Sequence, residues 1–208
     1  MRRLRVVQGI LWAGVAVALA VVAIALSGVL TRFVPARPDT VTSAGSGRPQ
    51  VGGPFRLVSH TGVEVTDSTL RGKPFGMFFG FTHCPDVCPT TLIELTERLK
   101  ELGSDADGIT FVFVTVDPER DTREVLASYM QSFDPRILAL TGASEEVAAI
   151  VKAYKAYARK VPTGSGDYTM DHTALVYLMD KQGAFRNTLD FHENKEAQLA
   201  KLRLVLRE

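Results

Sequence analysis

Cysteine is scarce in this chain, and so is any excess of charge of one sign. Two cysteines among 208 residues exclude a disulfide-scaffold protein. A formal net charge of +1, from 24 basic and 23 acidic side chains, gives no basic field, so we expect no nucleic-acid partner. Hydrophobic residues at 46% and charged residues at 23% are ordinary for a globular protein, which excludes a chain that is disordered throughout.

Charge is absent altogether from residues 6–30, close to the N-terminus. As a helix these residues would span roughly 37 Å, more than the roughly 30 Å hydrocarbon core of a bilayer. Three arginines stand among residues 1–5, and the positive-inside bias therefore places the N-terminus in the cytoplasm. We expect a single-pass anchor in the inner (cytoplasmic) membrane, with the rest of the chain in the periplasm.

A cleaved signal peptide is the alternative for the same segment. Ala23-Ile24-Ala25 resembles a cleavage site of the small-residue type. The apolar run is longer than the usual signal-peptide core, which favours the uncleaved anchor.

Two further regions follow the predicted anchor. Residues 31–54 contain four prolines and four glycines without apolar periodicity, which is typical of a flexible linker. Residues 55–208 are enough for one well-buried core, and we interpret them as a single domain.

Predicted strands and helices alternate along this domain. Apolar or alternating runs predict strands over 55–58, 62–65, 75–81, 109–116, 137–140, 173–179 and 184–189. Helical spacing predicts helices over 90–102 and 122–132, and two more that begin near Ser144 and Asn194. We expect Pro89 at the first helical position and Asp121 as an N-cap. The order predicts an α/β fold, with a mixed central sheet flanked by helices on both faces.

Both cysteines belong to one motif with the spacing Cys84-x3-Cys88, between a predicted buried strand and a predicted helix. A helix N-terminus favours the thiolate, which is the form that binds metal and attacks disulfides. Residues four apart in an ideal helix have Cβ atoms about 5–6 Å apart, whereas a disulfide needs about 3.5–4.5 Å. We therefore expect Cys84 in the loop and Cys88 at the start of the helix.

Spacing alone leaves three uses of the pair open: a structural disulfide, a redox couple and a metal site. A disulfide closing five residues contributes only about 2 kcal/mol, which is little for a domain with a full apolar core. His172 is the candidate third metal ligand, because it precedes a predicted strand whose end can lie beside the cysteines. His60, His83 and His192 are weaker candidates.

The segment 117–122 ends a predicted strand, and we interpret it as a turn followed by a helix cap. The alternative is a charged rim that helps a partner to dock.

Three motifs in this order resemble the Sco/SenC family of copper-binding proteins, which serves the assembly of cytochrome c oxidase: GFTHCPDVCP at 80–89, VTVDPERDT at 114–122 and DYTMDHT at 167–173. The resemblance implies a thioredoxin-like fold, and the predicted anchor and linker agree with it. It also implies that copper is bound by Cys84, Cys88 and His172. The partners implied are cytochrome c oxidase subunit II, with its dinuclear copper centre, and a copper donor protein.

The chemistry of this ligand set agrees with the resemblance. Thiolates select Cu(I), and imidazole accepts copper in both oxidation states. Zinc is the main rival, but a structural zinc site usually has four protein ligands. We expect Asp86 and Asp171 to orient the ligands from outside the metal's immediate shell.

The sequence thus favours a membrane-anchored copper metallochaperone. The alternative is a thiol-disulfide oxidoreductase that reduces the copper-ligand cysteines of subunit II, with Cys84 and Cys88 as its catalytic pair. Against a general disulfide reductase stand the x3 spacing and the residues Asp171-His172, where thioredoxin-type enzymes carry a proline. A peroxidase is a third option, since peroxiredoxin-like proteins share the fold.

Overall fold

The computed structural model describes residues 50–164 and 166–208, and its centre is a mixed β-sheet. Seven strands lie in the order β2-β1-β5-β4-β3-β8-β9. In chain order they are β1 Arg56–Ser59, β2 Glu64–Thr66, β3 Phe75–Gly80, β4 Thr110–Thr115, β5 Ile137–Thr141, β8 Leu175–Met179 and β9 Phe185–Asp190. The predicted strands of the sheet are confirmed, with shifts of a few residues at their ends.

The strand β3 is the centre of this sheet. All six of its residues are buried, as the apolar run FGMFFG predicts for a strand covered on both faces. It pairs parallel with β4 and antiparallel with β8, so Phe78 lies between Phe113 and Val176. The strand β3 therefore ends in the interior of the sheet, between β4 and β8, and the cysteine motif follows its C-terminal end.

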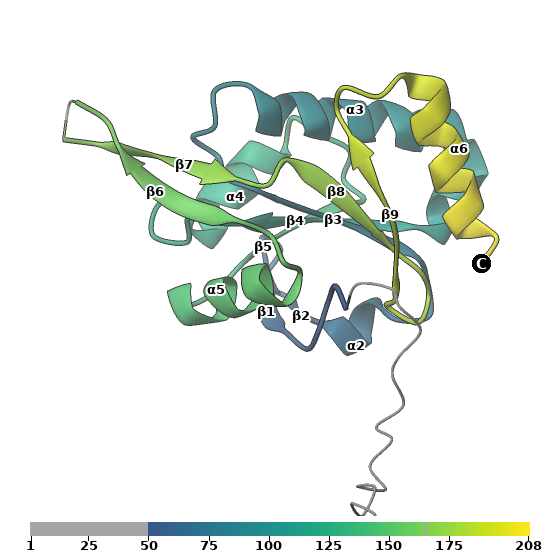
Figure 1. Ribbon diagram of the computed structural model, residues 1–208, viewed down its shortest axis with the longest axis horizontal. Coiled ribbons are helices and arrows are strands. Elements are labelled where there is room, and N and C mark those ends of the chain that lie inside the picture. Colours follow the sequence, from purple (N-terminus) through teal and green to yellow (C-terminus); the bar gives the residue numbers. More distant parts are fainter. Residues whose placement is uncertain (1–49, 165) are drawn as a thin grey trace, which may run out of the picture. The chain divides into compact units, whose positions relative to one another are not determined.

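Helices cover both faces of the sheet. The helices α3 and α6 lie on one face and α5 lies on the other (Figure 1). The helical elements are α2 Asp67–Leu70, α3 Val87–Leu102, the 3-10 helix η1 Gly103–Gly108, α4 Arg123–Met130, α5 Ser144–Ala153 and α6 Lys195–Leu206. The expected thioredoxin-like α/β fold is confirmed for the described residues; α2 and η1 were not predicted.

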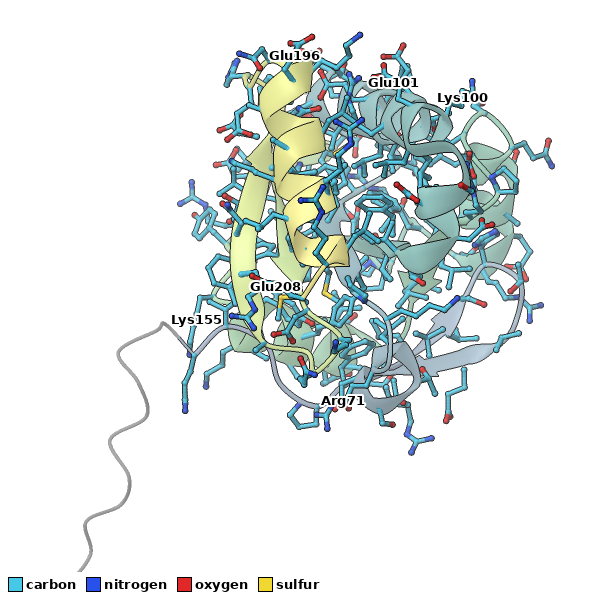
Figure 2. The ribbon with its side chains drawn as sticks, turned by 90° about the vertical axis from the view of Figure 1, so that its right-hand side faces the viewer. Arg71, Lys100, Glu101, Lys155, Glu196 and Glu208 are labelled. Carbon is cyan, nitrogen blue, oxygen red and sulfur yellow. The ribbon has the colours of Figure 1, made fainter. Side chains whose placement is uncertain are left out.

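The helices α3 and α6 pack side by side through a buried apolar face. Leu92 and Leu99 of α3 and Leu202 of α6 are at most 1% exposed. Figure 2 shows Glu101, near the end of α3, and Glu196, near the start of α6, on the same side of the domain. Within this interface the buried Arg98 Nε donates to Gln198 Oε1 at 3.0 Å, which satisfies both polar groups.

Two predicted helix starts are wrong by one or two residues. The helix α4 is capped by Thr122, whose side chain accepts from the Val125 amide, and not by Asp121. Asp121 is instead buried, because its carboxylate accepts hydrogen bonds from the hydroxyls of Thr82 and Thr115. Pro89 is the third residue of α3 instead of the first, which costs no hydrogen bond because the first-turn amides have no helical partner.

A two-stranded hairpin was not predicted at all. The strands β6 Ala158–Pro162 and β7 Tyr168–His172 pair antiparallel and project from the body of the domain (Figure 1). His172 is therefore the last residue of β7 and does not open a strand over 173–179, since β8 begins only at Leu175.

The predicted anchor over 6–30, with the N-terminal residues 1–5, lies outside the described residues and stays a prediction. Within residues 50–164 and 166–208, no helix combines the length and apolar character that a membrane crossing requires. Of the predicted linker 31–54, the described part reaches the domain, because the Gly52 amide donates to the Ala153 carbonyl at 3.0 Å.

Candidate metal centre

The cysteine motif forms a tight connection between β3 and α3. Cys84 lies in the loop, where its amide donates to the Phe81 carbonyl at 3.3 Å, and Cys88 is the second residue of α3. The predicted placement of both cysteines is therefore confirmed. A Cβ atom on Gly80 would lie 2.8 Å from Cys88 Sγ. Glycine at the end of β3 thus leaves the space in which the Cys88 sulfur sits.

The two sulfurs differ in burial and in proton affinity. Both cysteines are free; Cys84 is partly exposed, whereas Cys88 is fully buried. A hydrogen bond from the Cys88 thiol, together with those from the amides of Asp86 and Cys88, lowers the pKa of Cys84 to about 4. The same bond, together with burial, raises the pKa of Cys88. In the reduced pair, Cys84 is therefore the thiolate and Cys88 the thiol.

The imidazole of His172 faces this pair. Its Nε2 lies 3.4 Å from Cys88 Sγ, and its Nδ1 lies 3.0 Å from the Thr173 carbonyl oxygen. A carbonyl only accepts, so Nδ1 carries the proton and Nε2 presents a lone pair to the sulfurs. The rings of Phe78 and Phe81 contact the imidazole edge-on, with ring centroids 6.3 and 5.7 Å from the imidazole centroid. These contacts restrict the orientation of the imidazole plane.

The ligand atoms of Cys84, Cys88 and His172 all lie within 4.8 Å of one another. The structure thus brings together the three residues that were predicted to bind metal. Two sulfurs and one imidazole nitrogen fit a copper ion, since thiolates select Cu(I) and imidazole binds copper in either state. A disulfide needs its sulfurs at about 2.05 Å, much closer than two ligands of one metal. The same loop therefore serves a bound metal or a disulfide, but not both at once.

The two predicted supporting aspartates, Asp86 and Asp171, take different positions. Asp86 is exposed, and it is its backbone amide that bonds to Cys84. The carboxylate of Asp171 is exposed on β7 and pairs with Arg159 Nη2 at 3.4 Å. Their role in orienting the ligands stays a prediction.

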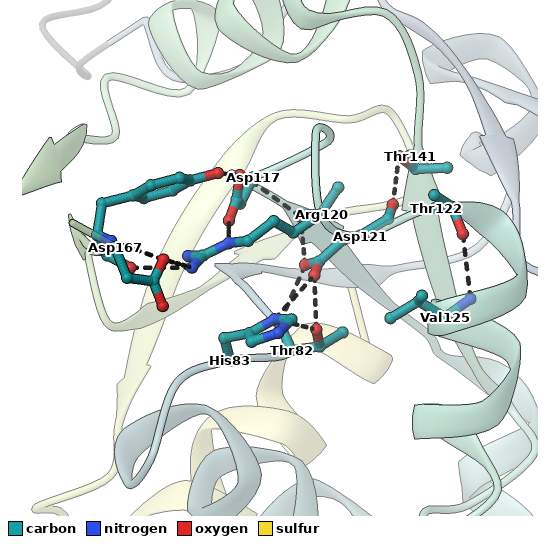
Figure 3. A network of polar contacts seen from close by, with 11 residues as sticks. Thr82, His83, Asp117, Arg120, Asp121, Thr122, Val125, Thr141 and Asp167 are labelled. Atoms are coloured by element: carbon teal, nitrogen blue, oxygen red, sulfur yellow. Dashed lines mark hydrogen bonds and ion pairs between the residues drawn. The ribbon is translucent and has the colours of Figure 1, made fainter. Parts of the chain in front are cut away.

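A buried carboxylate that the sequence suggested only as a helix cap holds the cysteine loop in place. Asp121 is fully buried and accepts from the Thr82 amide at 3.0 Å and from the Thr82 hydroxyl at 2.6 Å (Figure 3). It also accepts from the Thr115 hydroxyl at 2.6 Å. These bonds join the loop after β3 to the end of β4, and so fix the position of the residues just before Cys84.

A second network joins the segment 117–122 to the hairpin that carries His172. The Arg120 guanidinium pairs with the buried Asp117 and donates to the Tyr168 carbonyl at 2.9 Å (Figure 3). It stacks 3.8 Å above the Tyr168 ring, and the Tyr168 hydroxyl donates to Asp117 at 2.8 Å. Asp117 and Asp121 are at most 1% exposed, so they cannot belong to the charged rim that was the alternative for this segment.

Comparison with known proteins gives one consistent result. A family model described as SCO1/SenC matches residues 43–207. The human Protein SCO1 homolog, mitochondrial, is 41% identical over 152 residues, which cover 72% of this chain and 50% of that protein. Protein SenC of Rhodobacter capsulatus is 38% identical over 185 residues, which cover 86% of this chain and 80% of that protein. The chain spans about half the length of the curated mitochondrial relatives it matches.

Solved structures agree with these sequence matches. The structure of Bradyrhizobium japonicum ScoI with copper bound is 49% identical in sequence, with a TM-score of 0.70, and the match covers 74% of this chain and 99% of that chain. Yeast Sco1 with copper bound is 36% identical, with a TM-score of 0.71, and the match covers 77% of this chain and 90% of that chain.

Proposed function

This chain belongs to the SCO1/SenC family, and we propose that it is a copper chaperone that holds its cargo through Cys84, Cys88 and His172. One observation carries the proposal: the three ligand atoms lie within 4.8 Å of one another. A metal binds the thiolate form of cysteine, and the pKa of the buried Cys88 is raised, so Cys88 must release its proton when copper binds.

The destination that we propose is the dinuclear copper centre of cytochrome c oxidase subunit II. The proposal rests on the resemblance to the Sco/SenC family, and on relatives whose solved structures contain copper. The donor that loads the chain is a further partner. The predicted anchor would hold the domain at the periplasmic face of the inner membrane, beside a membrane-bound partner.

An anaerobic titration of the reduced, full-length chain with Cu(I), against a competing chromophoric chelator, tests the site. The wild type should bind one copper per chain. His172→Ala should weaken binding by more than the about 10–100-fold that losing an outer-shell partner typically costs. His192→Ala is the matched control, because it removes an exposed histidine that is not one of the three ligand residues. It should bind copper as the wild type does. Affinity that is indifferent to His172 would refute the site.

A second candidate function, thiol-disulfide exchange, is favoured by the Cys84 thiolate. Its sulfur would attack a disulfide of subunit II and form a mixed disulfide while one substrate thiolate leaves. Cys88 would then lose its proton and displace the other substrate thiol, so the substrate gains two electrons and the chain becomes a disulfide. This reaction needs no imidazole ligand. If His172→Ala reduces a model disulfide as fast as the wild type does, and the wild type binds copper only weakly, this function would be favoured over chaperoning.

A further inference from the structure

A second histidine, His83, is hydrogen-bonded in the same way as His172. The Thr82 hydroxyl donates to Asp121 Oδ1 at 2.6 Å, and His83 Nδ1 lies 3.1 Å from the same hydroxyl oxygen (Figure 3). A hydroxyl has one proton, and Thr82 gives it to the carboxylate. His83 Nδ1 must therefore be the donor in the second bond, so in the neutral imidazole the lone pair is on Nε2.

The surroundings of Asp121 determine which group donates in the hydrogen bond between Thr82 and Asp121. Its Oδ2 accepts from the Thr82 amide and from the Thr115 hydroxyl. The Thr115 oxygen itself accepts from the Asp117 amide at 2.9 Å, so its own proton must point to Asp121. The Asp121 carboxylate is thus an acceptor in all three of its side-chain hydrogen bonds, and the Thr82 hydroxyl has no free proton for His83.

The other two histidines lack this arrangement. His60 Nδ1 accepts from the Ala139 amide at 3.1 Å, so its lone pair is already used within the fold. The exposed His192 stacks on Phe191 at 3.9 Å, and its ring nitrogens make no hydrogen bond within the described residues. A donated Nδ1 proton with an open Nε2 is the usual state of a metal-binding histidine. Of the four histidines, all of them described, only the two beside the cysteine pair are held in it.

His83 differs from His172 in its exposure. Its side chain is 55% exposed, and it precedes Cys84, the more exposed of the two sulfurs. It does not belong to the group of three residues whose ligand atoms lie within 4.8 Å of one another. We propose that His83 is an outer ligand, which takes Cu(I) at the solvent side and passes it to Cys84. The proposal rests on the copper chaperone function.

The transfer is a ligand exchange in which no electron moves. The Nε2–copper bond forms as a bond to the copper carrier breaks. The Cys84 Sγ–copper bond then forms as the Nε2–copper bond breaks, and Cys88 gives its proton to solvent when it binds. Since His83 is absent from the final ligand set, it lowers the barrier equally for loading and unloading, and leaves the equilibrium affinity unchanged.

Stopped-flow measurement of copper exchange tests this role on the reduced, full-length chain. The Cu(I)–bicinchoninate complex serves as the donor, and excess bicinchoninate serves as the acceptor from the loaded protein. His83→Asn retains an N–H for the Thr82 hydroxyl but lacks the imidazole. We expect loading and unloading to slow by about tenfold each, equivalent to about 1.4 kcal/mol of activation free energy, at unchanged affinity. His83→Met supplies another soft ligand and should restore both rates.

His192→Asn is the matched control and should exchange copper at the wild-type rates. Unchanged rates in His83→Asn would overturn the proposal. Faster unloading at an unchanged loading rate, and so a weaker affinity, would overturn it as well, because that is the behaviour of a ligand in the final copper site. Failure of the wild type and His192→Asn alike to take up copper would instead overturn the chaperone function on which the proposal rests.

Discussion

At the scale of single residues, the space above Gly80 decides where the Cys88 sulfur can lie. A Cβ atom at this position would lie 2.6 Å from Phe113 Cε2 and 2.8 Å from Cys88 Sγ, closer than such contacts occur. Gly80→Ala should therefore lower the free energy of unfolding by about 1–3 kcal/mol. It should also weaken copper binding, because the sulfur must shift. Chemical denaturation and copper titration measure the two effects.

Gly164→Ala is the matched control for this substitution, since no atom lies within 4 Å of a Cβ placed there. Its stability and copper affinity should equal those of the wild type. A Gly80→Ala variant that matches this control in both would show that the sulfur is not confined by the glycine.

The charge on Cys84 gives a second prediction at this scale. A thiolate persists above its pKa, so iodoacetamide should alkylate Cys84 of the reduced, metal-free chain down to pH values near 4. Alkylation should fall only as the pH drops through that pKa. Cys88→Ala removes the hydrogen bond that contributes most to the shift, and should move the midpoint of the pH profile upward. A wild-type midpoint near 9, the ordinary thiol value, would contradict this picture.

How far the sequence predicts the site depends on the range of the contacts. Cys84 and Cys88 are close in sequence, so their spacing and the strand–helix pattern predict their placement. His172 is 84 residues further along than Cys88, so its position before a predicted strand and the resemblance, not the spacing, select it among four histidines. The role of Asp121 could not be predicted, because its partner Thr82 lies 39 residues away and the local pattern favours a helix cap.

At the scale of elements, the β6–β7 hairpin determines where His172 stands. The hairpin reaches the cysteine loop through Arg120, which touches Tyr168 at the far end of β7 from His172 and also lies 6.0 Å from the Phe81 ring. Phe81 in turn packs against the imidazole. Arg120 thus holds the hairpin and one wall of the imidazole pocket together.

Arg120→Lys should weaken this connection. Lysine keeps the charge but loses the flat stack on Tyr168 and the forked contacts, so the free energy of unfolding should fall by about 1–2 kcal/mol. Amides of residues 168–172 should exchange with deuterium faster. Arg159→Lys is the control: its pair with Asp171 is more than half exposed on both sides and contributes little. Equal exchange in both variants would refute a role for Arg120 in holding the hairpin.

The same hairpin shows where sequence patterns fail at this scale. The strands β3 and β4 are buried on both faces, so their apolar runs identify them directly. Most residues of β6 and β7 are exposed or only partly buried, and their polar side chains carry no apolar signal. A strand that contributes little to the core is determined by pairing across the hairpin, which no local pattern displays.

At the scale of the whole molecule, the predicted anchor over 6–30 would restrict the chain to a membrane surface. The intact mass of the protein extracted from membranes distinguishes the two interpretations of this segment. Retention of the full 208 residues is expected for an anchor. A mass that lacks about the first 25 residues would identify a cleaved signal peptide instead.

X-ray absorption at the copper edge measures directly whether two sulfurs and one imidazole hold the single copper ion that we propose. The reduced, copper-loaded chain should show two sulfur neighbours at about 2.3 Å and one nitrogen at about 2.0 Å, by analogy with zinc ligands. His172→Ala should lose the nitrogen and keep both sulfurs. A wild-type shell without nitrogen, or a shell that His172→Ala leaves unchanged, would contradict a site of two sulfurs and one imidazole nitrogen.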